Sequence, residues 1–160
     1  ITEHAVAFDP CILYTDATPQ GWGAVCLLGG RVFCAGGRWP LVDGKVVDIN
    51  VAELAAVSEG VSAFRQLLAE CSQLDIRVDN TSTAAGLKRG TTTSPHLAPM
   101  IDAAVKALQG VDVPITVRWV ASNENAASRQ GETTHAEVLA KTDASNLRPW
   151  SGCAQLRRSC

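Results

Sequence analysis

No run of apolar residues in this sequence reaches the roughly 18 residues that a membrane-spanning helix needs, and the chain does not open with a signal peptide. We therefore expect no membrane partner. Of the 160 residues, 46% are hydrophobic and 19% are charged, which is typical of a globular domain with one core. The first residue is Ile1 rather than Met, so we expect a fragment of a longer polypeptide.

The six cysteines include no CxxC pair, and no cluster of cysteine and histidine has the ligand spacing of a zinc site. Three cysteines fall in apolar stretches, where cysteine behaves as a small hydrophobic residue. We expect reduced, structural thiols, which are typical of an intracellular protein of the cytoplasm or nucleus.

An excess of positive charge is also missing, because the formal net charge is −2. A dedicated duplex binder is usually basic, since Lys and Arg neutralise phosphates. The composition argues against tight, independent binding of nucleic acid. It still allows an enzyme domain whose substrate is held by neighbouring domains and by metal ions.

Short apolar segments predict five strands. Residues 11–17 form the first, and residues 21–30 and 31–39 form a hairpin around Gly29 and Gly30, a pair suited to a tight turn. Residues 74–79 and 114–120 give two later strands.

Helical spacing is strongest from Asn50 to Cys71, with Asn50 as the expected N-cap. We expect three further helices, at Thr81–Leu87 with a stop near Gly90, at His96–Leu108 and at Thr134–Lys141.

The order of these elements predicts an α/β fold. Three strands before the first helix favour an antiparallel meander, and the later alternation favours parallel additions. The result is a mixed five-stranded sheet with helices on both faces. We assign residues 1–145 to this domain and residues 146–160 to a C-terminal tail or linker.

Three acidic residues stand where these elements begin or end. Asp16 lies near the end of the first strand, Glu53 near the start of the long helix, and Asp79 at the end of the fourth strand. Such positions can converge at one edge of an α/β sheet. Acids gathered without basic partners repel one another unless a cation neutralises them, and oxygen ligands select Mg²⁺ or Mn²⁺. Two such ions can activate water and stabilise the leaving oxygen in phosphodiester hydrolysis.

Each acid also has a purely structural interpretation. Asp16 is suited to capping the turn that follows it. Glu53 matches a capping arrangement with Asn50, and Asp79 with Asn80 is suited to starting the next helix. The joint occurrence of the three acids in this order of elements favours the metal site.

Four segments resemble the RNase H domains of retroelement polyproteins. YTDATPQGWGAV (14–25) resembles their first motif and INVAELAAV (49–57) their second. RVDNTSTAAGLKRG (77–90) resembles the third, in a form similar to that of DIRS-like, tyrosine-recombinase retrotransposons. WVASNENAASR (119–129) is similar to the last motif of the same group.

The resemblance implies an RNase H-like fold and a metal-dependent endonuclease that hydrolyses the RNA strand of an RNA–DNA hybrid. It also implies a reverse transcriptase domain in the same polyprotein. Asp16, Glu53 and Asp79 would be the catalytic acids and the ligands of two Mg²⁺ or Mn²⁺ ions.

The family usually carries a fourth acid a few residues after the asparagine that matches Asn125. That place falls on Ser128 or Arg129, which cannot replace a carboxylate. Glu137 lies in a segment that resembles the helix carrying the missing acid, and Glu132 is a weaker candidate.

Two residues near Glu137 leave alternatives open. Thr134 and Glu137 match a capping box, which gives Glu137 a structural interpretation. His135 is a candidate for proton transfer to the leaving group, as a loop histidine does in many relatives, or is a surface histidine near a helix start.

Candidate substrate contacts surround the third acid. Asn80 and Thr81 could bond the RNA 2′-hydroxyl or backbone, or could only cap a helix. Lys88 and Arg89, with Arg118, could contact phosphates, although the first two also suit a helix C-terminus. Three tryptophans could stack on bases but are more often packed in a sheet, namely Trp22, Trp39 and Trp119.

Two other functions stay open. The missing fourth acid allows a catalytically degenerate RNase H-fold module that binds or serves a structural role. A nuclease of the same superfamily that acts on DNA is the third possibility. Metal titration and a comparison of hybrid, duplex RNA and duplex DNA substrates would separate them.

Overall fold

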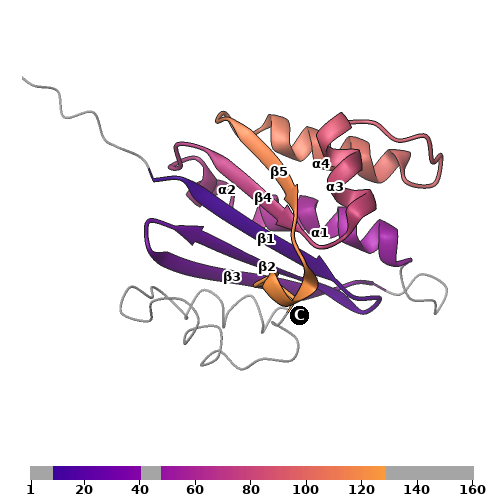
Figure 1. Ribbon diagram of the computed structural model, residues 1–160, viewed down its shortest axis with the longest axis horizontal. Helices are drawn as coiled ribbons and strands as arrows, with labels where there is room; N and C mark the ends of the chain where they lie inside the picture. Colours follow the sequence, from indigo (N-terminus) through magenta and orange to yellow (C-terminus); the bar gives the residue numbers. More distant parts are fainter. Residues whose placement is uncertain (1–8, 41–47, 129–160) are drawn as a thin grey trace, which may run out of the picture.

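The computed structural model describes residues 9–40 and 48–128, and the boundary expected at residue 145 lies outside them. These residues form a sheet, a layer of helices and one short 3-10 helix (Figure 1). The elements are, in chain order, β1 (Cys11–Ala17), β2 (Gly21–Leu28), β3 (Arg31–Arg38), α1 (Ile49–Ala63), α2 (Arg65–Leu68), β4 (Leu74–Val78), α3 (Thr81–Arg89), α4 (Ala98–Gln109), β5 (Ile115–Trp119) and η1 (Ser122–Glu124).

The five strands lie in the order β3-β2-β1-β4-β5. β1, β2 and β3 pair antiparallel, whereas β4 pairs parallel with both β1 and β5. The hairpin turns at Gly29 and Gly30, whose φ angles of 57° and 75° are the left-handed values that a tight two-residue turn requires. The predicted mixed sheet is therefore confirmed.

Helices α1, α3 and α4 contact one another and cover one face of the sheet (Figure 1). Alternate residues of β1 and β4, such as Leu13 and Ile76, point into this face and pack with Leu54 and Val57 of α1. The helix expected at Thr134–Lys141 lies outside the described residues.

The long helix differs from its prediction at both ends. Asp48, not Asn50, is the N-cap of α1, because its Oδ1 accepts from the backbone N–H groups of Asn50 (3.0 Å) and Val51 (3.3 Å). Aspartate is as good a cap as asparagine, and the aspartate two residues before Asn50 is the one that caps the helix. The helix also ends at Ala63, and α2 follows after Phe64 as a separate short helix.

The other helices follow their predictions closely. α3 extends to Arg89 and is capped by Gly90, whose φ of 69° is left-handed. α4 begins at Ala98 rather than His96, with Pro99 in its first turn, where a missing N–H costs no helical hydrogen bond. Within residues 9–40 and 48–128, no helix has both the length and the apolar character that crossing a membrane requires.

The second face of the sheet carries a small apolar cluster under the segment that follows β5. Ala127, 3% exposed, packs there with Val25, Val32 and Cys34. Ala127 thereby fixes the segment after β5 against β2 and β3. The four described cysteines, Cys11, Cys26, Cys34 and Cys71, are buried as the sequence predicts.

Candidate metal centre

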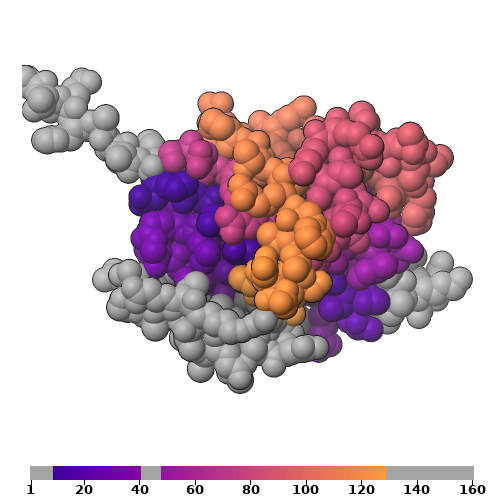
Figure 2. Space-filling view, viewed as in Figure 1, coloured from indigo at the N-terminus to yellow at the C-terminus, as the bar shows by residue number. Residues whose placement is uncertain are grey.

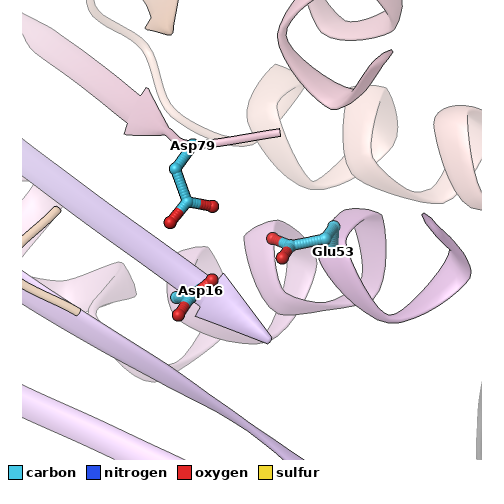
Figure 3. Close-up of side chains that lie close together, drawn as sticks. All are labelled: Asp16, Glu53 and Asp79. Carbon is cyan, nitrogen blue, oxygen red and sulfur yellow. The ribbon is translucent and has the colours of Figure 1, made fainter. Parts of the chain in front are cut away.

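The three predicted acids meet at the carboxyl ends of β1 and β4. Asp16 is the second-to-last residue of β1, Asp79 follows the last residue of β4, and Glu53 is the fifth residue of α1. One carboxylate oxygen from each residue lies within 4.8 Å of the other two. Figure 3 shows the three side chains pointing toward one another. Parallel pairing explains the meeting of Asp16 and Asp79, since it brings the two strand ends to the same edge.

A glycine that the sequence analysis did not single out brings Glu53 to this edge. Gly60 of α1 faces the sheet, where a Cβ atom would lie 3.0 Å from Thr15 Cγ2 and 3.2 Å from the Ala24 side chain. The missing side chain lets α1 approach β1 and β2 closely. This close approach places Glu53 above Asp16.

The site holds more negative charge than its surroundings stabilise. Burial, followed by the charges of Asp16 and Asp79, raises the pKa of Glu53 to about 9. Burial and the charge of Asp79 raise the pKa of Asp16 to about 6. Glu53 is 4% exposed, and its Oε2 atom is buried without a hydrogen-bond partner.

A divalent cation fits this arrangement. The ion pairs formed among the described residues involve Asp48 and Asp75, so no Lys, Arg or His of that part of the chain neutralises the three acids. A cation would give Glu53 Oε2 a partner and would remove the repulsion that favours protonation. Carboxylate oxygens suit Mg²⁺ or Mn²⁺.

No protein-family model and no curated protein matches the chain. Solved structures do match. RNase H1 of the halophilic archaeon Halobacterium salinarum NRC-1 is 18% identical with a TM-score of 0.58, and the match covers 74% of this chain and 89% of that one. The chain has the RNase H fold.

Two further structures agree. The N-terminal RNase H domain of a Mycobacterium tuberculosis protein, solved as a fusion with maltose-binding protein, is 18% identical with a TM-score of 0.60. The match covers 75% of this chain and 94% of that one. LC11-RNase H1, isolated from compost and solved in complex with an RNA/DNA hybrid, is 15% identical with a TM-score of 0.61, over 72% and 88% of the two chains. At these identities the likeness establishes the fold alone.

Within this RNase H fold, neighbouring residues make the capping contacts that we considered for the acids. In the turn after β1, the Thr18 hydroxyl accepts from the backbone N–H of Gly21 (3.1 Å). Asp48 caps α1, and Asn80 caps α3 by accepting from the Thr83 N–H (2.9 Å). Capping therefore does not explain Asp16, Glu53 or Asp79.

The candidate substrate contacts near Asp79 differ in exposure and in the hydrogen bonds that they already make. The Asn80 amide is used in the cap of α3 and in a 3.4 Å hydrogen bond to Asn50 Oδ1. Thr81 is exposed at the start of α3, and Lys88 and Arg89 are exposed in its last turn. The contacts of these residues with nucleic acid stay predictions.

Arg118 and the tryptophans have partners of their own. Arg118 forms an ion pair with Asp75 (3.3 Å), which occupies its guanidinium. Trp22 packs against the core, and the Trp39 indole donates to the Thr18 carbonyl (3.0 Å). Trp119 is 51% exposed, and its indole N–H donates to the Asp79 carbonyl (3.1 Å).

The place of the family's fourth acid holds no carboxylate among the residues that the structure describes. Ser128 closes a turn there, because its hydroxyl donates to the carbonyls of Ser122 (2.8 Å) and Asn125 (2.9 Å). Arg129, the other position expected for this acid, lies outside the described residues, as do the candidates Glu132, Glu137 and His135.

Proposed function

We propose that this domain is a metal-dependent ribonuclease H, an endonuclease that hydrolyses the RNA strand of RNA–DNA hybrids. The observation that carries the proposal is the convergence of Asp16, Glu53 and Asp79 within 4.8 Å without a cationic partner among the described side chains. Repelling carboxylates lower the stability of a fold, and such clusters are typical of functional sites, here one that binds a cation. The RNase H fold around the site supports the choice of reaction.

Asp16, Glu53 and Asp79 are the residues that would hold one or two Mg²⁺ or Mn²⁺ ions. Such ions supply activation of water and stabilisation of the leaving oxygen in phosphodiester hydrolysis. The chain itself supplies rigid ligands. Glu53 is fixed by burial on α1, and Asp16 is fixed by its place in the paired part of β1 and β2.

The hybrid is the substrate class that the fold and the charge favour together. LC11-RNase H1, which has the same fold, was solved with an RNA/DNA hybrid. The net charge of −2 favours a substrate delivered by another domain rather than captured by this one. A reverse transcriptase domain of the same retroelement polyprotein, of the DIRS-like type that the four motifs resemble, is the partner we propose.

The fourth acidic group is proposed to come from the segment after Ser128. Glu137 is the first candidate, Glu132 the second, and His135 is the candidate for proton transfer to the leaving group. Single substitutions Glu137→Gln, Glu132→Gln and His135→Ala, compared for cleavage at saturating Mn²⁺, would assign these roles.

Hybrid cleavage by Asp16→Asn and Asp79→Asn tests the proposal. Both variants should lose cleavage while they stay folded, because asparagine keeps the shape of aspartate but removes the ligand charge. Asp102→Asn is the matched control, since it removes one exposed acid from α4. Wild-type cleavage by either site variant would reject the assignment, and cleavage of duplex DNA but not of hybrid would indicate a DNA nuclease.

A catalytically degenerate binding or structural module is the second candidate function. The turn closed by Ser128, where the family carries an acid, favours it. Such a module should show no Mg²⁺ or Mn²⁺ site at the three acids. A metal titration therefore separates the two functions before any substrate is tested.

A further inference from the structure

β1 and β4 stop pairing with each other before they reach Asp16 and Asp79. The parallel register of β1 and β4 ends at Tyr14 opposite Arg77. Thr15 and Asp16 therefore have no partner residue on β4, although they still pair with β2. The β1–β4 ladder brings the two strand ends together, but it does not itself pair Asp16 with Asp79.

Two side chains from the end of β5 and the loop after it reach the backbone at this gap. Asn125 Nδ2 donates to the carbonyl of Thr15 (3.0 Å), the residue directly before Asp16. The Trp119 indole N–H donates to the carbonyl of Asp79 itself (3.1 Å). Figure 2 shows this segment, in orange, crossing the middle of one face of the molecule.

Asn125 is held rigidly at its own end. Its side chain is 0% exposed, and its Oδ1 accepts from the backbone N–H of Ala127 (2.9 Å). Ala127 is in turn packed against Val25 and Val32. A buried amide without hydrogen bonds is costly. Rotating the Asn125 side chain would break both of its hydrogen bonds, so the side chain is held in one orientation.

We infer that Asn125 and Trp119 are positioning residues that set the separation of Asp16 and Asp79 and thereby the affinity for divalent cations. Asn125 ties the tip of β1, and Trp119 ties the tip of β4, to one continuous segment of chain. Partners behind metal ligands typically contribute about 10–100-fold to metal affinity or activity. The inference rests on the proposed function, because it assumes that the three acids bind a cation.

Trp119→Phe is the sharper of the two test variants. Phenylalanine keeps an aromatic ring at this half-exposed position but removes the N–H that the Asp79 carbonyl accepts. Thr116→Val is the matched control on the same strand, because it removes a side-chain hydrogen bond of similar length (3.0 Å, to Asp75) at the end of β5 away from the three acids. Asn125→Ala is the second variant, and circular dichroism shows whether it folds.

The readout is the dissociation constant of Mn²⁺, measured on the whole chain by electron paramagnetic resonance of free Mn²⁺. We expect affinity to fall about 10-fold in Trp119→Phe, at the lower end of the range for such partners, and further in Asn125→Ala. Thr116→Val should bind as the wild type does. Raising the Mn²⁺ concentration should restore hybrid cleavage by Trp119→Phe, which a loss of folding would not allow.

Wild-type Mn²⁺ affinity in Trp119→Phe would overturn the inference, whether or not Asn125→Ala folds. Equal losses in Trp119→Phe and Thr116→Val would overturn it too, because they would show a general effect of removing one hydrogen bond from β5. A wild-type chain that binds no Mn²⁺ would instead reject the proposed function itself, so the two failures are distinguishable.

Discussion

Glu53 and Asp16 face each other at the junction of α1 and β1, and the buried Glu53 is the more strongly perturbed acid of the two. Burial and the charges of Asp16 and Asp79 raise the pKa of Glu53 to about 9, whereas the pKa of Asp16 rises to about 6. At neutral pH and without a cation, Glu53 is therefore protonated and Asp16 is mostly ionised. A cation must displace the Glu53 proton to use the full site.

The stability of the metal-free protein should fall with pH because of Glu53. An acid whose pKa is higher in the folded state binds more protons when folded, so the free energy of unfolding falls as pH rises through this range. For Glu53 the range runs from 4.5 to about 9, and for Asp16 from 3.8 to about 6. Above pH 6 the effect belongs mainly to Glu53.

Glu53→Gln isolates this contribution. In urea unfolding with EDTA, the advantage of Glu53→Gln over the wild type should grow steadily from neutral pH to about pH 9, because glutamine cannot ionise. Glu59→Gln, an exposed position on the same helix, is the control. A constant difference between Glu53→Gln and the wild type over this range would contradict the shifted pKa.

Asp79→Asn should make the metal-free protein more stable while it loses cleavage. Because Glu53 is protonated at neutral pH, the substitution removes the repulsion between Asp79 and the ionised Asp16, which is about 1–4 kcal/mol depending on the local dielectric. Urea unfolding in EDTA at neutral pH would measure the gain. If Asp79→Asn is instead less stable than the wild type, the account of repulsion between these acids is wrong.

Asp48→Ala should lower the free energy of unfolding by about 1 kcal/mol, because it removes the side chain that caps α1. Asn50→Ala should cost less, since the Asn50 side chain accepts only a 3.4 Å hydrogen bond from Asn80. Chemical unfolding of the two variants compares them directly. A larger loss of stability in Asn50→Ala than in Asp48→Ala would indicate that Asn50, not Asp48, caps the helix.

Local patterns predicted the sheet and the places of three acids, and the resemblance of four motifs to retroelement RNase H domains singled these acids out as a candidate site. Short apolar segments marked the strands, the Gly29–Gly30 pair marked the hairpin, and the strand ends placed Asp16 and Asp79. These signals are local because side-chain period and turn geometry act over a few residues. Glu53 could be assigned to the same site because it lies near the start of the helix that connects the two strands in the sequence.

The contacts that hold the site together could not be predicted in this way. Asn125 and Thr15 are 110 residues apart in the chain, and Trp119 and Asp79 are 40 apart. A hydrogen bond from a side chain to a distant carbonyl leaves no periodic pattern. Asn125 was visible only as a landmark in the last motif, and Gly60 only as a glycine within a helix.

Isothermal titration calorimetry of Mn²⁺ binding, repeated in two buffers of different ionisation enthalpy, tests the central claim most directly. The account predicts that the wild type binds Mn²⁺ and releases a proton near neutral pH, since Glu53 must ionise to become a ligand. Glu53→Gln should bind more weakly and release fewer protons. A wild type that shows no binding, or binding without any proton release, would contradict the account.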